Sequence, residues 1–205
     1  MKLSHVNSSS SKIVYAALSV HQVSSKNRVY TIVLILDMRL HRVSNSNVYV
    51  IYLNAIPDVE NLTNPEFLEE MNRCLDVVEE GAGDKGLVIA SQGKFFSNGH
   101  DVKWLSNTSI SEGTRFINSF FETLERIMTL AFPTVAAMSG HAFAGGCLLA
   151  MACDYRVMRE DRGFVCMNEV DMKTVKPGTY PDADRKVNAV LSSKLPVNIL
   201  REMML

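Results

Sequence analysis

The sequence predicts an α/β fold with a mostly parallel sheet. Short runs of β-branched or small apolar residues, typical of buried strands, occur at residues 29–36, 48–53, 86–90 and 134–138. Longer segments with apolar residues at helical spacing separate them. Strands that alternate with helices favour parallel pairing through right-handed crossovers. The length of 205 residues, with 47% hydrophobic and 21% charged residues, is sufficient for one domain with a substantial core.

The N-terminal part combines a polar leader with two strands. Residues 1–28 contain a serine run and lysine or arginine at four positions, but no carboxylate. We expect them to be a disordered leader, and a transit peptide is the alternative. The strands at 29–36 and 48–53 are rich in β-branched and aromatic residues, and the polar segment 44–47 between them is typical of a turn. We expect these two strands to pair.

Two amphipathic helices follow. The first begins in Thr63-Asn-Pro-Glu66, where a hydroxyl or an amide can cap the helix and proline lies in its first turn. Apolar residues at helical spacing continue to Val78, and Gly81 or Gly83 ends the helix. The second helix, expected at 112–130 and ended by Pro133, has one apolar face.

Two loops that leave expected strands are the candidate functional segments. After the strand at 86–90, the loop at 92–101 ends in Asp101, which can cap a short helix, while Asn98 and Gly99 can turn the backbone sharply. After the strand at 134–138, residues 140–148 read Gly-His-Ala-Phe-Ala-Gly-Gly-Cys-Leu and lead into an apolar helix. Ligands in such sheets bind outside the carboxyl ends of strands, so the two loops can face one pocket.

The glycine-rich segment 140–148 fits neither common phosphate motif. The P-loop lysine and hydroxyl are missing after Gly145, and the glycine spacing differs from that of a dinucleotide fingerprint. Free N–H groups at a helix start can still bind a developing negative charge. An oxyanion site and a simple tight turn both remain open from this segment alone.

Composition excludes several other functions. The net charge of −1 gives no electrostatic footprint for nucleic acid, and no apolar run is long enough to span a bilayer. The four cysteines form no Cys-x-x-Cys pair, so we expect buried thiols and no metal site.

Four motifs in order resemble the enoyl-CoA hydratase/isomerase (crotonase) family, most closely the plant-type Δ3,Δ2-enoyl-CoA isomerases. They occupy residues 93–101 (Gly-Lys-Phe-Phe-Ser-Asn-Gly-His-Asp), 133–147, 153–159 and 167–171 (Met-Asn-Glu-Val-Asp). The resemblance implies the crotonase-like (ClpP/crotonase) ββα superhelix over residues 29–205. It also implies an acyl-CoA thioester as substrate, no cofactor other than the coenzyme A of that substrate, a homotrimer and the peroxisome, although the C-terminus lacks a Ser-Lys-Leu-type signal.

The resemblance also implies site roles. Backbone N–H groups of Asn98 and Gly145 would hold the thioester oxygen, and Glu169 would be the catalytic base. The adjoining residues Ser97, Gly99, His100, Asp101 and Gly146 would complete the oxyanion hole and the substrate-binding site. Hydratases of the family use a second glutamate, and its position here is Leu148, which cannot activate water. The expected reaction is therefore the shift of a 3-enoyl-CoA double bond to the 2-trans position in unsaturated fatty acid β-oxidation.

The chain departs from the family pattern near both ends. Residues 36–50 resemble an inserted segment, and Met172-Lys-Thr-Val-Lys-Pro-Gly178 replaces a Gly-Leu-rich loop. A helix over 197–204 is expected to end the chain, and the family's C-terminal helices are expected to be incomplete. A catalytically silent acyl-CoA-binding or assembly-modulating homologue, or another thioester-enolate enzyme of this fold, is therefore the alternative.

Overall fold

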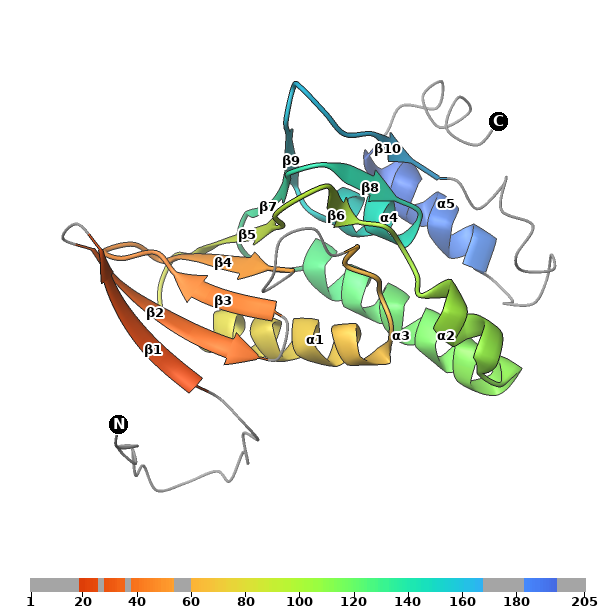
Figure 1. Ribbon diagram of the computed structural model, residues 1–205, viewed down its shortest axis with the longest axis horizontal. Helices are drawn as coiled ribbons and strands as arrows, with labels where there is room; N and C mark the ends of the chain where they lie inside the picture. The colour runs from red at the N-terminus through yellow and green to blue at the C-terminus, as the bar shows by residue number, and fades with distance from the viewer. Residues whose placement is uncertain (1–18, 26–27, 36–37, 54–59, 168–182, 195–205) are drawn as a thin grey trace.

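The computed structural model describes residues 19–25, 28–35, 38–53, 60–167 and 183–194. A seven-stranded sheet has the order β1-β2-β3-β4-β5-β7-β9, and a three-stranded sheet has the order β10-β8-β6. Helices α1 and α3 lie along one face of the larger sheet, and α4 lies beside the smaller sheet (Figure 1).

The N-terminal half of the larger sheet is an antiparallel meander. It contains β1 (Ser19–Ser25), β2 (Arg28–Ile35), β3 (Met38–Arg42) and β4 (Val48–Tyr52). The predicted pairing of the strands at 29–36 and 48–53 is wrong, because β3 lies between β2 and β4. The leader predicted for residues 1–28 is wrong over Ser19–Ser25, which form an edge strand, and residues 1–18 lie outside the described residues.

The rest of the chain repeats one arrangement, in which each unit gives one strand to each sheet and then a helix. The units are β5 (Gly86–Ala90) and β6 (Phe95–Ser97) with α2 (Val102–Asn107) and α3 (Ile110–Met128), β7 (Thr134–Met138) and β8 (His141–Phe143) with α4 (Gly145–Ala152), and β9 (Tyr155–Met158) and β10 (Val165–Cys166) with α5 (Ala183–Lys194). All strand pairs from β4 onward are parallel. The predicted ββα arrangement is therefore observed.

Helix ends follow local chemistry. Helix α1 (Pro65–Glu80) begins after Asn64, whose side chain accepts a hydrogen bond from the Phe67 N–H, and it ends at Gly81. Helix α3 starts two residues before the predicted position because Ser109 and Glu112 form a capping box. The sequence did not indicate β6, β8 or α5, and the helix expected at 197–204 lies outside the described residues.

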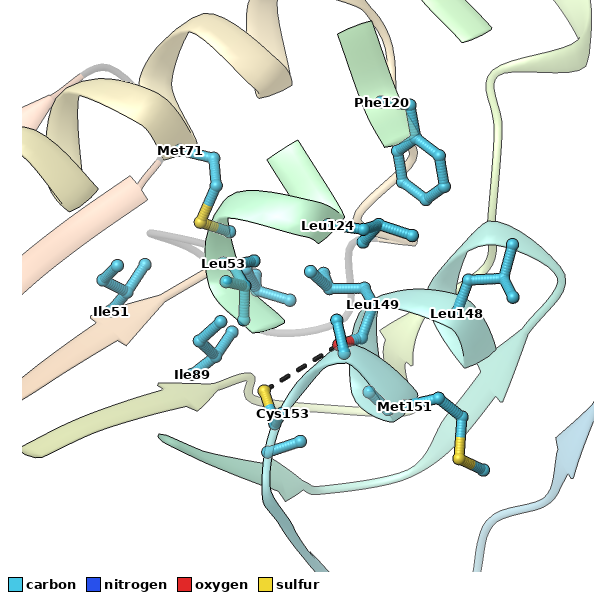
Figure 2. Packing of buried hydrophobic residues seen from close by; sticks show 14 of the residues in the cluster. Ile51, Leu53, Met71, Ile89, Phe120, Leu124, Leu148, Leu149, Met151 and Cys153 are labelled. Atoms are coloured by element: carbon cyan, nitrogen blue, oxygen red, sulfur yellow. Dashed lines mark hydrogen bonds between the residues drawn. The ribbon is translucent and has the colours of Figure 1, made fainter. Parts of the chain in front are cut away.

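One hydrophobic core joins the layers. Helix α4 is buried along its whole length, and Figure 2 shows its Leu149 directed towards Leu53 and Leu124, with Leu148 on the other side of the helix. A helix that is apolar all round must be enclosed by other elements. The larger sheet, the smaller sheet and helices α3 and α5 surround α4, so the N-terminus of α4 is held in a fixed position.

Candidate functional site

The two loops predicted to be functional meet beside the start of α4. Gly146 lies so close to Ser97 that a Cβ atom at position 146 would overlap the Ser97 carbonyl oxygen. A Cβ atom at Gly99 would lie 2.9 Å from the Ala144 Cβ and 3.3 Å from the Gly145 nitrogen. The 97–101 loop and the 140–146 loop therefore form one site, as their positions after strands predicted.

A third segment, residues 60–63, fixes the 97–101 loop by backbone hydrogen bonds. The Asn98 N–H donates to the Glu60 carbonyl at 2.8 Å, and the Thr63 N–H donates to the Gly99 carbonyl at 2.8 Å. The Asp101 N–H then donates to the Thr63 carbonyl at 2.9 Å. These last two bonds make Thr63 and His100 an isolated parallel bridge.

This pattern assigns different directions to neighbouring N–H groups. The Asn98 N–H is occupied by Glu60, so the thioester-oxygen role predicted for Asn98 does not fit the backbone geometry. Since backbone groups alternate between the two edges of an extended segment, the His100 N–H points away from Thr63. The His100 N–H donates no hydrogen bond to an acceptor among the described residues.

The Gly145 N–H is a second donor without an acceptor among the described residues. It is the first residue of α4, and the first N–H groups of a helix lack a partner within the helix. The preceding residue, Ala144, has φ 51° and ψ −121°, a conformation that costs free energy for a residue with a Cβ atom. This turn directs the chain from β8 into α4, and the Ala144 N–H itself donates to the Cys166 carbonyl.

The remaining predicted residues have structural contacts in the same place. The Ser97 hydroxyl donates to the Asn61 carbonyl at 2.7 Å and accepts from the Gly99 N–H. Gly99 has φ +87°, as its predicted sharp turn requires, and Asp101 caps α2 by accepting from the Trp104 N–H. Leu148 is buried, and Glu169 lies outside the described residues, so its predicted role as base stays a prediction.

The His100 side chain is partly buried and packs against two aromatic rings. Its Nδ1 lies 2.6 Å from the Thr63 hydroxyl, and its ring makes edge contacts with Phe116 and Phe120, with centroids 5.2 and 4.7 Å away. Burial lowers the pKa of His100 to about 4, because an apolar environment disfavours the charged imidazolium. The imidazole is therefore neutral near pH 7.

Sequence reasoning missed two residues of the site, Asn61 and Thr63. Asn61 is buried at φ 50°, and its amide donates to the Phe95 and Phe96 carbonyls. Thr63 was interpreted only as part of a helix start. An asparagine shortly before a helix start is the only signal that could have indicated Asn61, because asparagine tolerates the left-handed backbone.

The described residues hold no group of three or more metal-ligating side chains, and none of their helices is long and apolar enough to cross a membrane. Three of the four cysteines are buried, as expected, while Cys166 is partly exposed.

Comparison with known proteins identifies relatives over most of the chain. A family model described as enoyl-CoA hydratase/isomerase matches residues 43–205. The chain is 34% identical over 130 residues to enoyl-CoA delta isomerase 1, peroxisomal, of Arabidopsis thaliana, covering 62% of this chain and 54% of that protein. It is 32% identical over 113 residues to the mitochondrial enoyl-CoA hydratase of Pongo abelii, covering 55% of this chain and 38% of that protein. The chain therefore spans about half the length, or less, of these relatives.

Solved structures show the same fold. An enoyl-CoA hydratase of Thermoplasma volcanium aligns with a TM-score of 0.68 at 19% identity, over 83% of this chain and 64% of that one. An enoyl-CoA isomerase of Mycobacterium tuberculosis aligns with a TM-score of 0.67 at 22% identity, over 82% and 67%. The fold is therefore crotonase-like, as the sequence resemblance implied.

Proposed function

The chain belongs to the enoyl-CoA hydratase/isomerase family, and on that premise we propose that it is an isomerase that moves the double bond of a 3-enoyl-CoA to the 2-trans position. In this proposal the N–H groups of His100 and Gly145 hold the thioester oxygen. Glu169 takes a proton from C2 and returns it to C4. The intermediate is an enolate, whose negative charge develops on the thioester oxygen.

The two free N–H groups support enolate chemistry. Both lie where the 97–101 loop meets the start of α4, and neither is occupied by an acceptor among the described residues. Donors that are fixed before the reaction stabilise the charge of the transition state more than the neutral ground state. One such donor is typically worth about 2.7 to 4 kcal/mol.

Leu148 is the residue that favours isomerisation over hydration in this proposal. It is buried at 1% exposure in the position where the family resemblance places the second glutamate of hydratases. An isobutyl group can neither orient nor deprotonate water, and isomerisation needs only one base because the same proton is removed and returned. The delta-isomerase names of the Arabidopsis relatives agree with this choice.

The experiment is a double-bond shift assay with 3-hexenoyl-CoA, in which the conjugated product is followed by ultraviolet absorbance. The wild-type protein should form 2-trans-hexenoyl-CoA, and Glu169→Gln should lose about 10²- to 10⁴-fold in kcat, the usual contribution of a positioned base. Glu160→Gln, in an exposed turn, is the matched control. Equal rates for Glu169→Gln and Glu160→Gln would refute the assignment of the base.

Product analysis separates the alternatives. Formation of a 3-hydroxyacyl-CoA from 2-trans-hexenoyl-CoA would show hydration and contradict the role given to Leu148. Binding of a CoA thioester without turnover would instead support the catalytically silent homologue.

We also propose a peroxisomal location, a role in β-oxidation and assembly as a homotrimer. Two Arabidopsis relatives are named peroxisomal, whereas the Pongo hydratase is named mitochondrial. Imaging of the protein fused at its N-terminus and, separately, at its C-terminus tests the compartment, and light scattering tests the trimer.

A further inference from the structure

The imidazole of His100 separates three parts of the site. It contacts Thr63 before α1, Phe116 and Phe120 of α3, and Gly145 at the start of α4. A Cβ atom at Gly145 would lie 2.9 Å from the His100 Cε1 and 3.1 Å from its Nδ1, so the ring lies directly against the Gly145 backbone. The ring therefore sets the spacing between residue 145 and residue 100, the two residues with free N–H groups.

The hydrogen bond from Thr63 fixes the orientation of that ring. Thr63 is fully buried, and the only hydrogen-bond partner of its hydroxyl among the described residues is the His100 Nδ1, at 2.6 Å. A buried hydroxyl without an acceptor is unfavourable, so we assign the proton of this bond to Thr63 and the ring proton to Nε2. This assignment requires a neutral ring, in agreement with the burial of His100 among phenylalanines.

Thr63 therefore holds His100 twice, once through the backbone and once through the side chain. The Thr63 N–H and carbonyl bind the residues on either side of His100, and the Thr63 hydroxyl binds the ring. The direction of the His100 N–H is thus fixed by the bridge, and its distance from Gly145 by the ring.

From these contacts we propose that Thr63 and His100 form a positioning pair, in which the imidazole acts as a spacer that aligns the backbone N–H groups of His100 and Gly145 on one oxygen atom. The proposal rests on the thioester-oxygen role given to these donors in the proposed function. In it the His100 side chain is a positioning group, because it acts through Gly145 and through its own backbone.

The pair should affect kcat rather than KM. Misplacement of a donor by about 1 Å can cost about 10²-fold in rate, and an interaction made mainly in the transition state changes kcat more than KM. His100→Ala keeps the backbone N–H but removes the spacer, so we expect a loss of about 10²-fold in kcat and a KM within about threefold of wild type. His100→Phe keeps a ring of similar size and should retain more activity than His100→Ala.

The Thr63 variants test the hydrogen bond without removing the ring. Thr63→Val should lower kcat about fivefold, the usual effect of one lost hydrogen bond, and Thr63→Ser, which keeps the hydroxyl, should restore it. The matched control is Thr123→Val, which also removes a buried hydroxyl but one that bonds to Asn72 and the Ser119 carbonyl. This control should keep the wild-type kcat.

A spectroscopic readout separates positioning from folding. Donors that polarise a thioester carbonyl shift the absorbance of bound 2,4-hexadienoyl-CoA to longer wavelength, and this shift should be reduced in His100→Ala and Thr63→Val but not in Thr123→Val. A wild-type kcat and an unchanged shift in His100→Ala would overturn the proposal. If thermal melting shows that His100→Ala is unfolded, the comparison of Thr63→Val with Thr63→Ser decides.

The same measurements distinguish failure of the positioning pair from failure of the proposed function. If the wild-type protein neither turns over 3-hexenoyl-CoA nor shifts the spectrum of 2,4-hexadienoyl-CoA, the proposed function itself is refuted. In contrast, the wild-type protein can be active while Thr63→Val, Thr63→Ser and Thr123→Val all have the same kcat and the same spectral shift. That result would refute only the positioning role of Thr63 and His100.

Discussion

The 140–146 loop and the 97–101 loop meet at the same site, but they differ in how closely their backbone is packed. Besides the hydrogen bonds of residues 141–144, the 140–146 loop is fixed by close packing, because Cβ atoms at Gly140 and Gly146 would overlap the carbonyl oxygens of Lys94 and Ser97. The 97–101 loop is fixed by hydrogen bonds to residues 60–63, which occupy the N–H groups of Asn98 and Asp101, while the His100 N–H has no acceptor among the described residues.

The difference bears on the two donors of the proposed function, because the sequence resemblance implied Gly145 but gave Asn98 in place of His100. Close packing of backbone leaves a local signal, because only glycine fits. A hydrogen-bond pattern set by a segment about 40 residues away leaves no such signal. We therefore expect substitutions to act on the two loops in different ways, and the following predictions are ordered by the size of their effects.

The largest effect is expected from Gly146→Ala, which tests the close packing of the 140–146 loop. The added methyl group would overlap backbone atoms of Ser97, and neither the start of α4 nor β6 can move without disturbing the core. We expect a loss of about 3 kcal/mol or more in the free energy of unfolding, measured by urea denaturation. Gly86→Ala is the control, because a Cβ atom there would have its nearest neighbour at 3.7 Å. Equal stabilities of the two variants would show that close packing does not hold the loop.

The second prediction concerns the stability of the protein at acidic pH, which depends on His100 in the 97–101 loop. Burial lowers the pKa of His100 from 6.5 in the unfolded chain to about 4 in the folded protein. Above pH 6.5 both states are neutral, so the shift has no effect on stability. Between pH 6.5 and 4 only the unfolded state gains the proton, so stability falls as pH falls, by about 3 kcal/mol at pH 4.

The variant His100→Phe isolates this term, because it keeps an aromatic ring that cannot be protonated. The free energy of unfolding of both proteins should be measured from pH 7 to pH 4. Carboxylates elsewhere titrate equally in both, so the wild type should lose about 3 kcal/mol more than the variant. Parallel curves would mean that His100 is not shielded from water and that the loop is more open than the structure indicates.

The third prediction concerns Asn61→Ala, which removes side-chain hydrogen bonds to the strand that leads into the 97–101 loop. The change removes the amide that binds the Phe95 and Phe96 carbonyls and places alanine at φ 50°, where asparagine is better tolerated. We expect a loss of about 2 kcal/mol, since a buried carbonyl is left without a donor. Asn107→Ala, which removes an exposed amide bonded to the Lys103 carbonyl, should change stability by less than about 0.5 kcal/mol.

The sequence predicts best where local chemistry decides the structure. Asp101 caps α2 as expected, and the apolar face of α3 is buried. The α/β alternation and four ordered motifs were sufficient to identify the fold. Strand β3 escaped prediction because its polar residues alternate with buried Met38 and Leu40 over only five positions.

The sequence predicted which loops lie at the candidate site, but not which backbone atoms of those loops face it. Gly145 begins α4, and the donor role that the resemblance implied for it stays a proposal. The choice between Asn98 and His100 depends on which backbone edge faces residues 60–63, and that is a tertiary property. Thr63 illustrates the same limit, because its hydroxyl bonds to His100 rather than capping the adjacent helix.

The smallest effect is expected from Asn98→Ala, which tests whether the Asn98 side chain takes part in the reaction. The variant keeps the backbone N–H that donates to Glu60, and it changes neither the His100 N–H nor the Gly145 N–H. The kcat for 3-hexenoyl-CoA should stay within about twofold of wild type, as for substitutions outside specific contacts. A loss approaching that of His100→Ala would mean that the Asn98 side-chain amide itself acts on the substrate, and that the 97–101 loop contributes more than the backbone N–H of His100.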